Sequence, residues 1–202
     1  LGGGMYIWGS ETNAPHLAMP AFMESYHPNH VRPDLPLVNI FKFFAAYKNF
    51  EKVADIGADP NNVPPALNRT WSETVKVYLE TQEVISEVAP GVYFNYWTFN
   101  KQVPGPMLRV RTGDTVELTI KNNESSLHSH NVDLHSVTGP GGGASLTLVK
   151  PGETKAFSWK ALQPGLYVYH CAMANVSTHN SHGQYGLILV EPKDGLPKVD
   201  KE

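Results

Sequence analysis

The stretch Leu166-Tyr-Val-Tyr-His-Cys171 has the alternating pattern of a β-strand, and it ends in two adjacent residues that can bind a metal. His179 follows eight residues after the cysteine, and Gln184 lies five residues further on. A thiolate and an imidazole suit a soft, redox-active metal, and a blue-copper centre needs two imidazoles, one thiolate and a weak axial group. The stretch therefore predicts a copper site whose second imidazole comes from another segment.

Such an imidazole is available in Ser129-His-Asn-Val-Asp-Leu-His135, which offers His130 and His135. In an extended chain, neighbouring and odd-spaced residues point to opposite faces. His170 and Cys171 should therefore serve different metals, as should His130 and His135. We expect two copper sites joined by the peptide unit between His170 and Cys171. Their expected ligands are His130, Cys171, His179 and an axial residue for the first site, and His135 with His170 for the second.

Composition narrows the class of protein. The chain has 202 residues, which is enough for one domain with extensions or two small domains. Its formal net charge is -3, and 41% of its residues are hydrophobic. Lys and Arg are scattered, which argues against a nucleic-acid partner, and a single cysteine excludes an internal disulfide framework. No apolar run reaches the roughly 18 residues of a transmembrane segment. The chain begins at Leu1 without an initiator Met, which is compatible with export.

Residues 1–70 predict an N-terminal arm. Residues 1–36 are rich in Pro, Gly, His and Asn and lack periodicity. Over about 37–56, by contrast, apolar residues recur at intervals of three and four residues, and Gly57 follows as a C-cap. We expect one amphipathic helix there, followed by a Pro-rich linker. Its aromatic stripe favours docking on the same protein or on another subunit, with a membrane-surface contact as the alternative.

From about residue 71 to residue 192, the hydrophobic pattern has a period of two residues. Residues 75–79 and 116–120 alternate apolar and polar side chains, as half-buried strands do. Further candidate strands are residues 92–99, 107–111, 146–149, 155–160, 166–171 and 185–191. Turn signals such as Pro-Gly fall between them. Short strands at this spacing predict an all-β fold, a Greek-key β-sandwich.

With these motifs, residues 74–202 resemble the first cupredoxin domain of copper-containing nitrite reductases. The matching segments are Tyr96-Trp-Thr-Phe-Asn100, Val103-Pro-Gly-Pro106, His130-Asn-Val-Asp-Leu-His135, Ala161-Leu-Gln-Pro-Gly-Leu-Tyr-Val-Tyr-His-Cys-Ala172 and Tyr185-Gly-Leu-Ile-Leu-Val-Glu-Pro192. The resemblance implies a cupredoxin domain over residues 71–192. It also implies that residues 193–202 are a linker toward a second cupredoxin domain, which is missing here.

The resemblance assigns roles to individual residues. It makes His130, Cys171 and His179 ligands of a type 1 copper, makes His135 and His170 ligands of a type 2 copper, and makes Asp133 the active-site carboxylate that delivers protons. The axial methionine of the family falls on Gln184, with His182 or Met173 as alternative axial ligands. His128 and His182 are otherwise interpreted as solvated loop residues.

By the same resemblance, the activity is the one-electron reduction of nitrite to nitric oxide, with electrons passing from type 1 to type 2 copper through Cys171 and His170. The donor would be a small copper protein or a c-type cytochrome, and the assembly a periplasmic or exported homotrimer. Either another chain completes the type 2 site, or this chain is a fragment, or the type 2 site is lost. The alternative is an electron-transfer cupredoxin module with type 1 copper only. An oxidase that reduces oxygen is disfavoured, because only one histidine flanks Cys171.

Overall fold

A computed structural model describes residues 36–197 and 199 of the chain, which divides into two compact units, Leu1–Asn49 and Phe50–Glu202. The described part of the first unit consists of helix α3 (Pro36–Ala46) and the 3-10 turn η2 (Tyr47–Asn49). The helix is therefore shorter than the predicted 37–56, and the larger unit begins at Phe50 rather than at residue 71. Residues 1–35 of the predicted arm lie outside the described residues.

The helical repeat fails after Asn49 because the next residues pair with a strand. Strand β1 (Glu51–Val53) runs parallel to residues 84–86 of strand β2 (Thr74–Ala89). Phe50, which the repeat placed on the helix, is buried in the larger unit. Pairing with a distant strand outweighs the local helical pattern here, as tertiary context commonly does.

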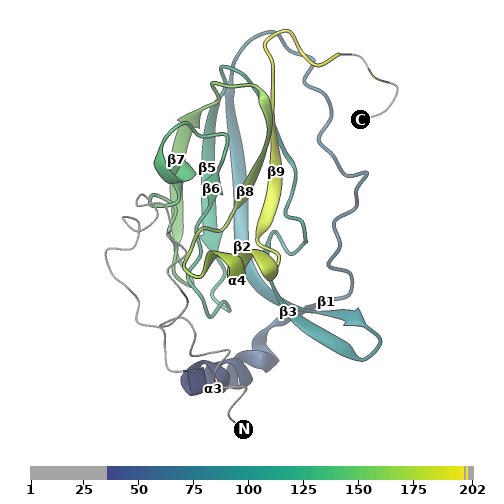
Figure 1. Ribbon diagram of the computed structural model, residues 1–202, viewed down its shortest axis with the longest axis vertical. Helices are drawn as coiled ribbons and strands as arrows, with labels where there is room; N and C mark the ends of the chain where they lie inside the picture. Colours follow the sequence, from purple (N-terminus) through teal and green to yellow (C-terminus); the bar gives the residue numbers. More distant parts are fainter. Residues whose placement is uncertain (1–35, 198, 200–202) are drawn as a thin grey trace. The chain divides into compact units, whose positions relative to one another are not determined.

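The first sheet of the larger unit contains β1, β2, β3 (Val92–Phe99), β5 (Thr115–Asn122) and β7 (Thr154–Lys160). The first half of β2 pairs in parallel with β5, and its second half pairs antiparallel with β3. Strand β5 pairs antiparallel with β7. Figure 1 shows the β2–β3 hairpin projecting beyond the sheet.

The second sheet has the order β4 (Leu108–Arg111), β9 (Tyr185–Glu191), β8 (Gly165–His170) and β6 (Asp133–Leu134). The predicted strands therefore form, except residues 146–149. That segment contributes only an isolated bridge between Val149 and His130, because Leu146 ends a turn and Thr147 lies in a bend. The second sheet also carries both metal-binding stretches of the sequence at one end.

Buried side chains of the two sheets form one hydrophobic core. Leu79, Leu118 and Ile120 of the first sheet pack with Tyr169 and Ile188 of the second, and each of these side chains is fully buried. The all-β sandwich with a small helix is thus confirmed. Among the described residues, no helix has the length and apolar character needed to cross a membrane.

Two buried ion pairs fasten the segment before β2 to the sandwich. Arg69 donates two hydrogen bonds to Asp114, which also accepts the backbone N–H groups of Glu73 and Arg111. Arg109 pairs with Glu191 and donates to the carbonyl of Pro64. The predicted linker is therefore held along this part of its length, because buried charges require such partners.

Candidate copper sites

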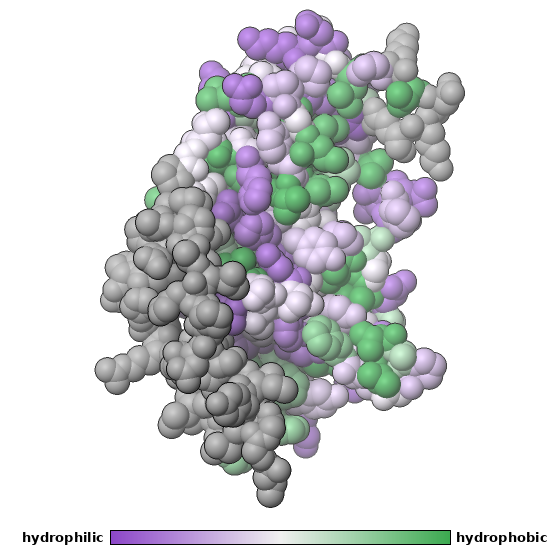
Figure 2. Space-filling view, in the orientation of Figure 1, coloured by the Kyte–Doolittle hydropathy of each residue, from purple (hydrophilic) through white to green (hydrophobic). Residues whose placement is uncertain are grey.

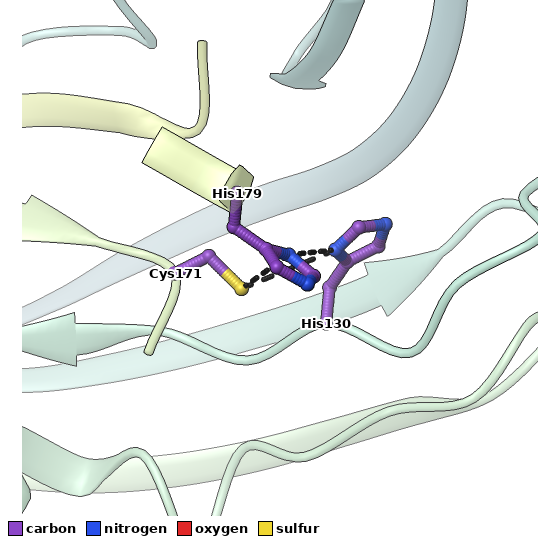
Figure 3. Close-up of side chains that lie close together, drawn as sticks. All are labelled: His130, Cys171 and His179. Atoms are coloured by element: carbon purple, nitrogen blue, oxygen red, sulfur yellow. Dashed lines mark hydrogen bonds between the residues drawn. The ribbon is translucent and has the colours of Figure 1, made fainter. Parts of the chain in front are cut away.

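A thiol and two imidazoles meet at one end of the sandwich. His130 Nδ1 lies 3.2 Å from His179 Nδ1, and Cys171 Sγ lies 3.3 Å from His179 Nδ1 and 3.9 Å from His130 Nδ1. All three side chains are buried, and Figure 3 shows them pointing toward one another. The structure thus brings together the three residues predicted as ligands of the first copper.

Three different segments position these side chains. Cys171 directly follows β8, and its backbone N–H donates to the carbonyl of Gln184. His130 exchanges two backbone hydrogen bonds with Val149. His179 lies on the short helix α4 (Val176–Ser181). Because each ligand is held by backbone hydrogen bonds, the cluster is formed by the fold itself.

Gln184 adds an oxygen to the cluster, since its Oε1 lies 3.0 Å from His179 Nδ1 and its side chain is fully buried. The alternative axial residues have other contacts: His182 Nδ1 lies 2.7 Å from the backbone carbonyl of Asn95, and Met173 packs against the hydrophobic core. Two nitrogens, one sulfur and a weak oxygen donor are a donor set that suits copper. The structure thus favours Gln184 over His182 as the axial group.

Burial controls the protonation of this cluster. Burial raises the pKa of the Cys171 thiol to about 12, and it lowers the pKa of His179 to about 3. It also lowers the pKa of His130 below its ordinary value. The imidazoles are therefore neutral and able to bind a metal at pH 7, whereas the thiol needs a nearby cation to ionise.

A second cluster lies beside the first, on the other side of the strand. His135 Nε2 lies 3.1 Å from His170 Nε2, and a carboxylate oxygen of Asp133 lies within 4.8 Å of both imidazoles. Asp133 pairs with His170 in the β6–β8 register. His135 is exposed and His170 half-buried, whereas Asp133 is buried. Cys171 and His170 thus face different clusters, as the alternation predicted.

Glycines make room for the carboxylate of Asp133. Gly142 has a φ of 50°, and a Cβ atom built on it would lie 2.1 Å from Asp133 Oδ1 and 2.5 Å from two backbone atoms of Leu134. Only glycine fits such a position without displacing its neighbours. The Gly-rich turn therefore forms one wall of the second cluster.

His128 and His182 lie in loops as interpreted, and both are only partly exposed because they pack on an aromatic ring. Both imidazoles stack on Trp97, at centroid distances of 4.2 Å for His128 and 4.3 Å for His182. Trp97 in turn meets His179 edge to face at 4.6 Å. Glu83, which sequence reasoning missed, is fully buried behind these rings. Nothing in the alternation around residue 83 indicates that its carboxylate is buried.

The sandwich and the buried thiol–imidazole cluster define a copper protein of the cupredoxin class. The sequence model of the multicopper oxidase family matches residues 80–195. This chain therefore belongs to the multicopper oxidase family, and copper is its expected metal.

Comparison with individual proteins shows which members of this family the chain is similar to. A copper-containing nitrite reductase from Neisseria meningitidis serogroup A is 59% identical over 140 residues, which are 69% of this chain and 36% of the relative. A solved copper nitrite reductase from Nitrosomonas europaea is 41% identical, with a TM-score of 0.58 over 64% of this chain and 46% of that one. A solved multicopper oxidase is 27% identical, with a TM-score of 0.53 over 72% of this chain and 50% of that one.

The predicted resemblance to copper-containing nitrite reductases is thus confirmed. The chain spans only about a third of the length of these curated relatives, 36% in the relative from Neisseria meningitidis.

Proposed function

We propose that this chain carries out copper-dependent, one-electron reduction of nitrite to nitric oxide. The observation that carries the proposal is the pair of donor clusters on opposite sides of one strand end, each holding the residues that the nitrite reductase resemblance assigns to it in this chain. Copper bound at the two clusters would supply one-electron transfer and Lewis-acid polarisation of the nitrite oxygens. The buried cluster suits type 1 copper and the more exposed cluster suits type 2 copper.

The backbone provides a route for the electron between the clusters. Cys171 belongs to the buried cluster and His170 to the exposed one, and the two residues are consecutive. His170 Nδ1 also lies 3.0 Å from the carbonyl oxygen of Cys171, so a hydrogen bond runs alongside the covalent path. We propose that electrons enter at the buried cluster and leave through the imidazole of His170.

Asp133 provides the proton chemistry that this reaction requires. Reduction of nitrite to nitric oxide and water consumes one electron and two protons, because one N–O bond breaks and its oxygen leaves as water. The carboxylate of Asp133 lies beside the imidazoles of His135 and His170. A carboxyl group at this position can hydrogen-bond the departing oxygen and deliver a proton to it.

A neighbouring chain is proposed to complete the exposed cluster. Two imidazoles are fewer than the three protein ligands of most open catalytic metal sites. Leu166 and Val168 on β8 and Leu187 on β9 are large exposed apolar side chains, and β8 continues from them to His170. Figure 2 shows apolar side chains (green) on the surface over β8 and β9. A domain packed on this surface would lie next to His135 and His170 and could add the third ligand.

Copper stoichiometry with electron paramagnetic resonance on the purified protein, including any chain that copurifies, tests the proposal. Two coppers per chain with distinct type 1 and type 2 signals, together with nitric oxide production from nitrite, are expected. Cys171→Ser should remove only the type 1 signal, and His170→Ala should remove only the type 2 signal. Type 1 copper alone, without turnover, would instead support the electron-transfer module.

The remaining expectations stay predictions. These are the small copper protein or c-type cytochrome as electron donor, the homotrimer, and the periplasmic or exported location.

A further inference from the structure

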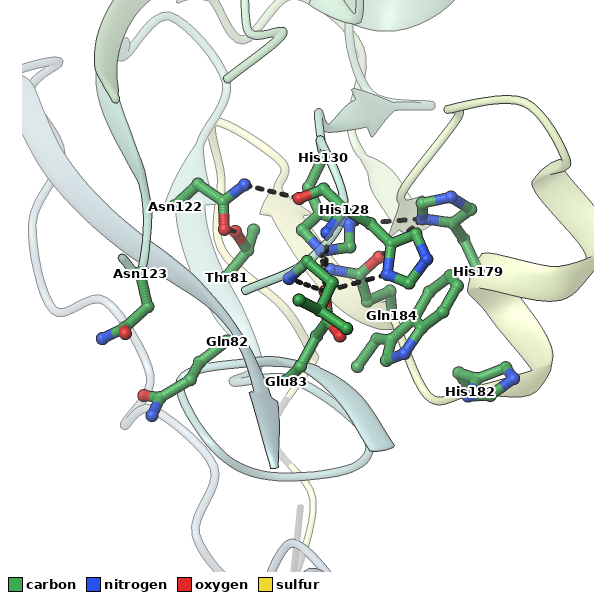
Figure 4. A network of polar contacts seen from close by, with 12 residues as sticks. Thr81, Gln82, Glu83, Asn122, Asn123, His128, His130, His179, His182 and Gln184 are labelled. Carbon is green, nitrogen blue, oxygen red and sulfur yellow. Dashed lines mark hydrogen bonds and ion pairs between the residues drawn. The ribbon is translucent and has the colours of Figure 1, made fainter. Parts of the chain in front are cut away.

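Glu83 is a fully buried carboxylate that faces the loop leading to His130. Its Oε1 accepts the backbone N–H groups of Leu127 at 2.7 Å and His128 at 2.8 Å, and it lies 2.9 Å from His128 Nδ1. Figure 4 shows Glu83 beneath the imidazoles of His128 and His130. Burial raises the pKa of Glu83, but the hydrogen bond with His128 and the nearby imidazole of His130 lower it below the ordinary value. The carboxylate is therefore ionised.

The two ring nitrogens of His130 face different surroundings. Nδ1 points to Cys171 and His179, whereas Nε2 lies 3.8 Å from Glu83 Oε1. Among the described residues, His130 Nε2 and Glu83 Oε2 are buried atoms without a hydrogen-bond partner. Buried polar atoms that lack a partner are unfavourable, so each such atom calls for an explanation. Nε2 is therefore the ring nitrogen of His130 on the side of the Glu83 carboxylate, which can attract a proton there.

The contacts of His179 determine which nitrogen of His130 carries the proton. Gln184 Oε1 can only accept a hydrogen bond, so the 3.0 Å contact makes His179 Nδ1 a donor. His179 Nδ1 also contacts His130 Nδ1, which must then accept. A neutral imidazole with an accepting Nδ1 carries its hydrogen on Nε2, the side that faces Glu83.

We propose that Glu83 is a positioning residue for the buried copper site, holding His130 with its proton on Nε2 and its Nδ1 lone pair directed at the metal. A carboxylate behind a metal-bound histidine commonly fixes its tautomer and orientation and raises its basicity. The inference rests on the proposed type 1 site and adds a residue that acts through a ligand rather than on the metal.

Glu83 also influences the second imidazole of the cluster, by an indirect route. It holds the ring of His128, which stacks on Trp97 at 4.2 Å, and Trp97 contacts the edge of the His179 ring at 4.6 Å. One carboxylate thus faces the ring of His130 and is linked to the ring of His179 through His128 and Trp97.

Nitrogen NMR of the metal-free full-length protein, labelled with ¹⁵N at histidine, tests the proposal without depending on copper. We expect His130 in the unmutated protein to carry its proton on Nε2. Glu83→Gln keeps an oxygen for the two backbone N–H groups but removes the negative charge beside His130 Nε2, so a proton on Nε2 is attracted less. The proton of His130 should then move toward Nδ1. A proton on Nδ1 of His130 in the unmutated protein would overturn the proposal without any variant.

Glu191→Gln is the matched control, because Glu191 is an equally buried glutamate that pairs with Arg109 instead of a histidine. It should lower stability but leave the tautomer of His130 unchanged. If Glu83→Gln behaves like this control, Glu83 only stabilises the loop and the proposal is refuted.

Copper loading gives a second readout and separates this proposal from the proposed function. Glu83→Gln should weaken binding at the buried site by about 10- to 100-fold. It should also raise the reduction potential, because a nearby negative charge favours the oxidised metal. An unchanged affinity and potential would overturn the role of Glu83 while leaving nitrite reduction intact. Absence of type 1 copper in the unmutated protein, with His130 protonated on Nε2, would refute the proposed function and leave the tautomer assignment standing.

Discussion

Replacing Gly142 with alanine should displace the carboxylate of Asp133 and destabilise the fold. The backbone at Gly142 is left-handed, with a φ of 50°, which costs a non-glycine residue about 1–2 kcal/mol. The new Cβ would also lie 2.1 Å from Asp133 Oδ1 and 2.5 Å from the backbone of Leu134, so the surroundings must move. Such overpacking adds about 1–3 kcal/mol.

Gly91→Ala provides the control for the backbone contribution. Gly91 is also left-handed, with a φ of 76°, but no atom lies within 4 Å of a Cβ built on it. Both substitutions restrict the unfolded chain in the same way, so that contribution cancels. Gly142→Ala should therefore be less stable than Gly91→Ala by about 1–3 kcal/mol, the steric part alone.

Urea unfolding followed by tryptophan fluorescence would measure this difference, and nitrite turnover of the assembled protein would report the position of Asp133. Gly142→Ala should lose turnover while its type 1 spectrum stays unchanged, and Gly91→Ala should keep both. Equal stability and turnover in the two variants would refute the idea that Gly142 makes room for the carboxylate.

Three other predictions concern single side chains. Asp133→Asn should keep both copper signals yet lose most turnover, and retained turnover would refute its role in proton delivery. Gln184→Met should raise the type 1 reduction potential in voltammetry, because a thioether favours the oxidised metal less than an oxygen donor does; an unchanged or lower potential would contradict the axial assignment. Asp114→Asn removes the buried carboxylate that pairs with Arg69, which keeps only the more exposed Glu73 as an ionic partner, and should cost about 1.5–3 kcal/mol of unfolding free energy at pH 7. Burial raises the pKa of Asp114, but hydrogen bonds from Arg69 and two backbone groups hold it below its ordinary value. The advantage of the unmutated protein is therefore complete above the ordinary pKa and shrinks as the pH falls through the lowered one. A constant difference in unfolding free energy between pH 7 and pH 3 would refute this.

Strands such as β5 and β9 were predictable because buried and more exposed residues alternate along them. Strands β3 and β9 have the predicted bounds, 92–99 and 185–191. The second half of β2 was not predicted, since residues 81–86 are buried on both faces and lack alternation. Strand β1 was concealed by a helical repeat, and α4 is too short for a periodic signal. A hydrophobic pattern in the sequence indicates which residues of one segment are buried. It does not reveal elements that form because they pair or pack with distant segments.

The residues of the clusters were predictable for a different reason. Cysteine and histidine are chemically distinctive, so their spacing indicated which side chains would meet before any contact was known. Glu83 is a common residue type, and its contact with His128 spans 45 positions of the chain. The stacking of His182 on Trp97 depends equally on a distant partner. Ligands were therefore visible in the sequence, and the groups that hold them were not.

The length of strand β2 has a consequence for how the chain folds. Its second half and β3 form a hairpin between neighbours in the sequence, whereas its first half pairs with β5, as Thr74 does with Thr115. Hairpins form in about 1–10 μs, and pairings between distant segments are slower because a long loop must close first. Once the hairpin exists, the rest of β2 is already extended and attached to it. The order of folding, hairpin first and sandwich afterwards, then follows from the length of one strand.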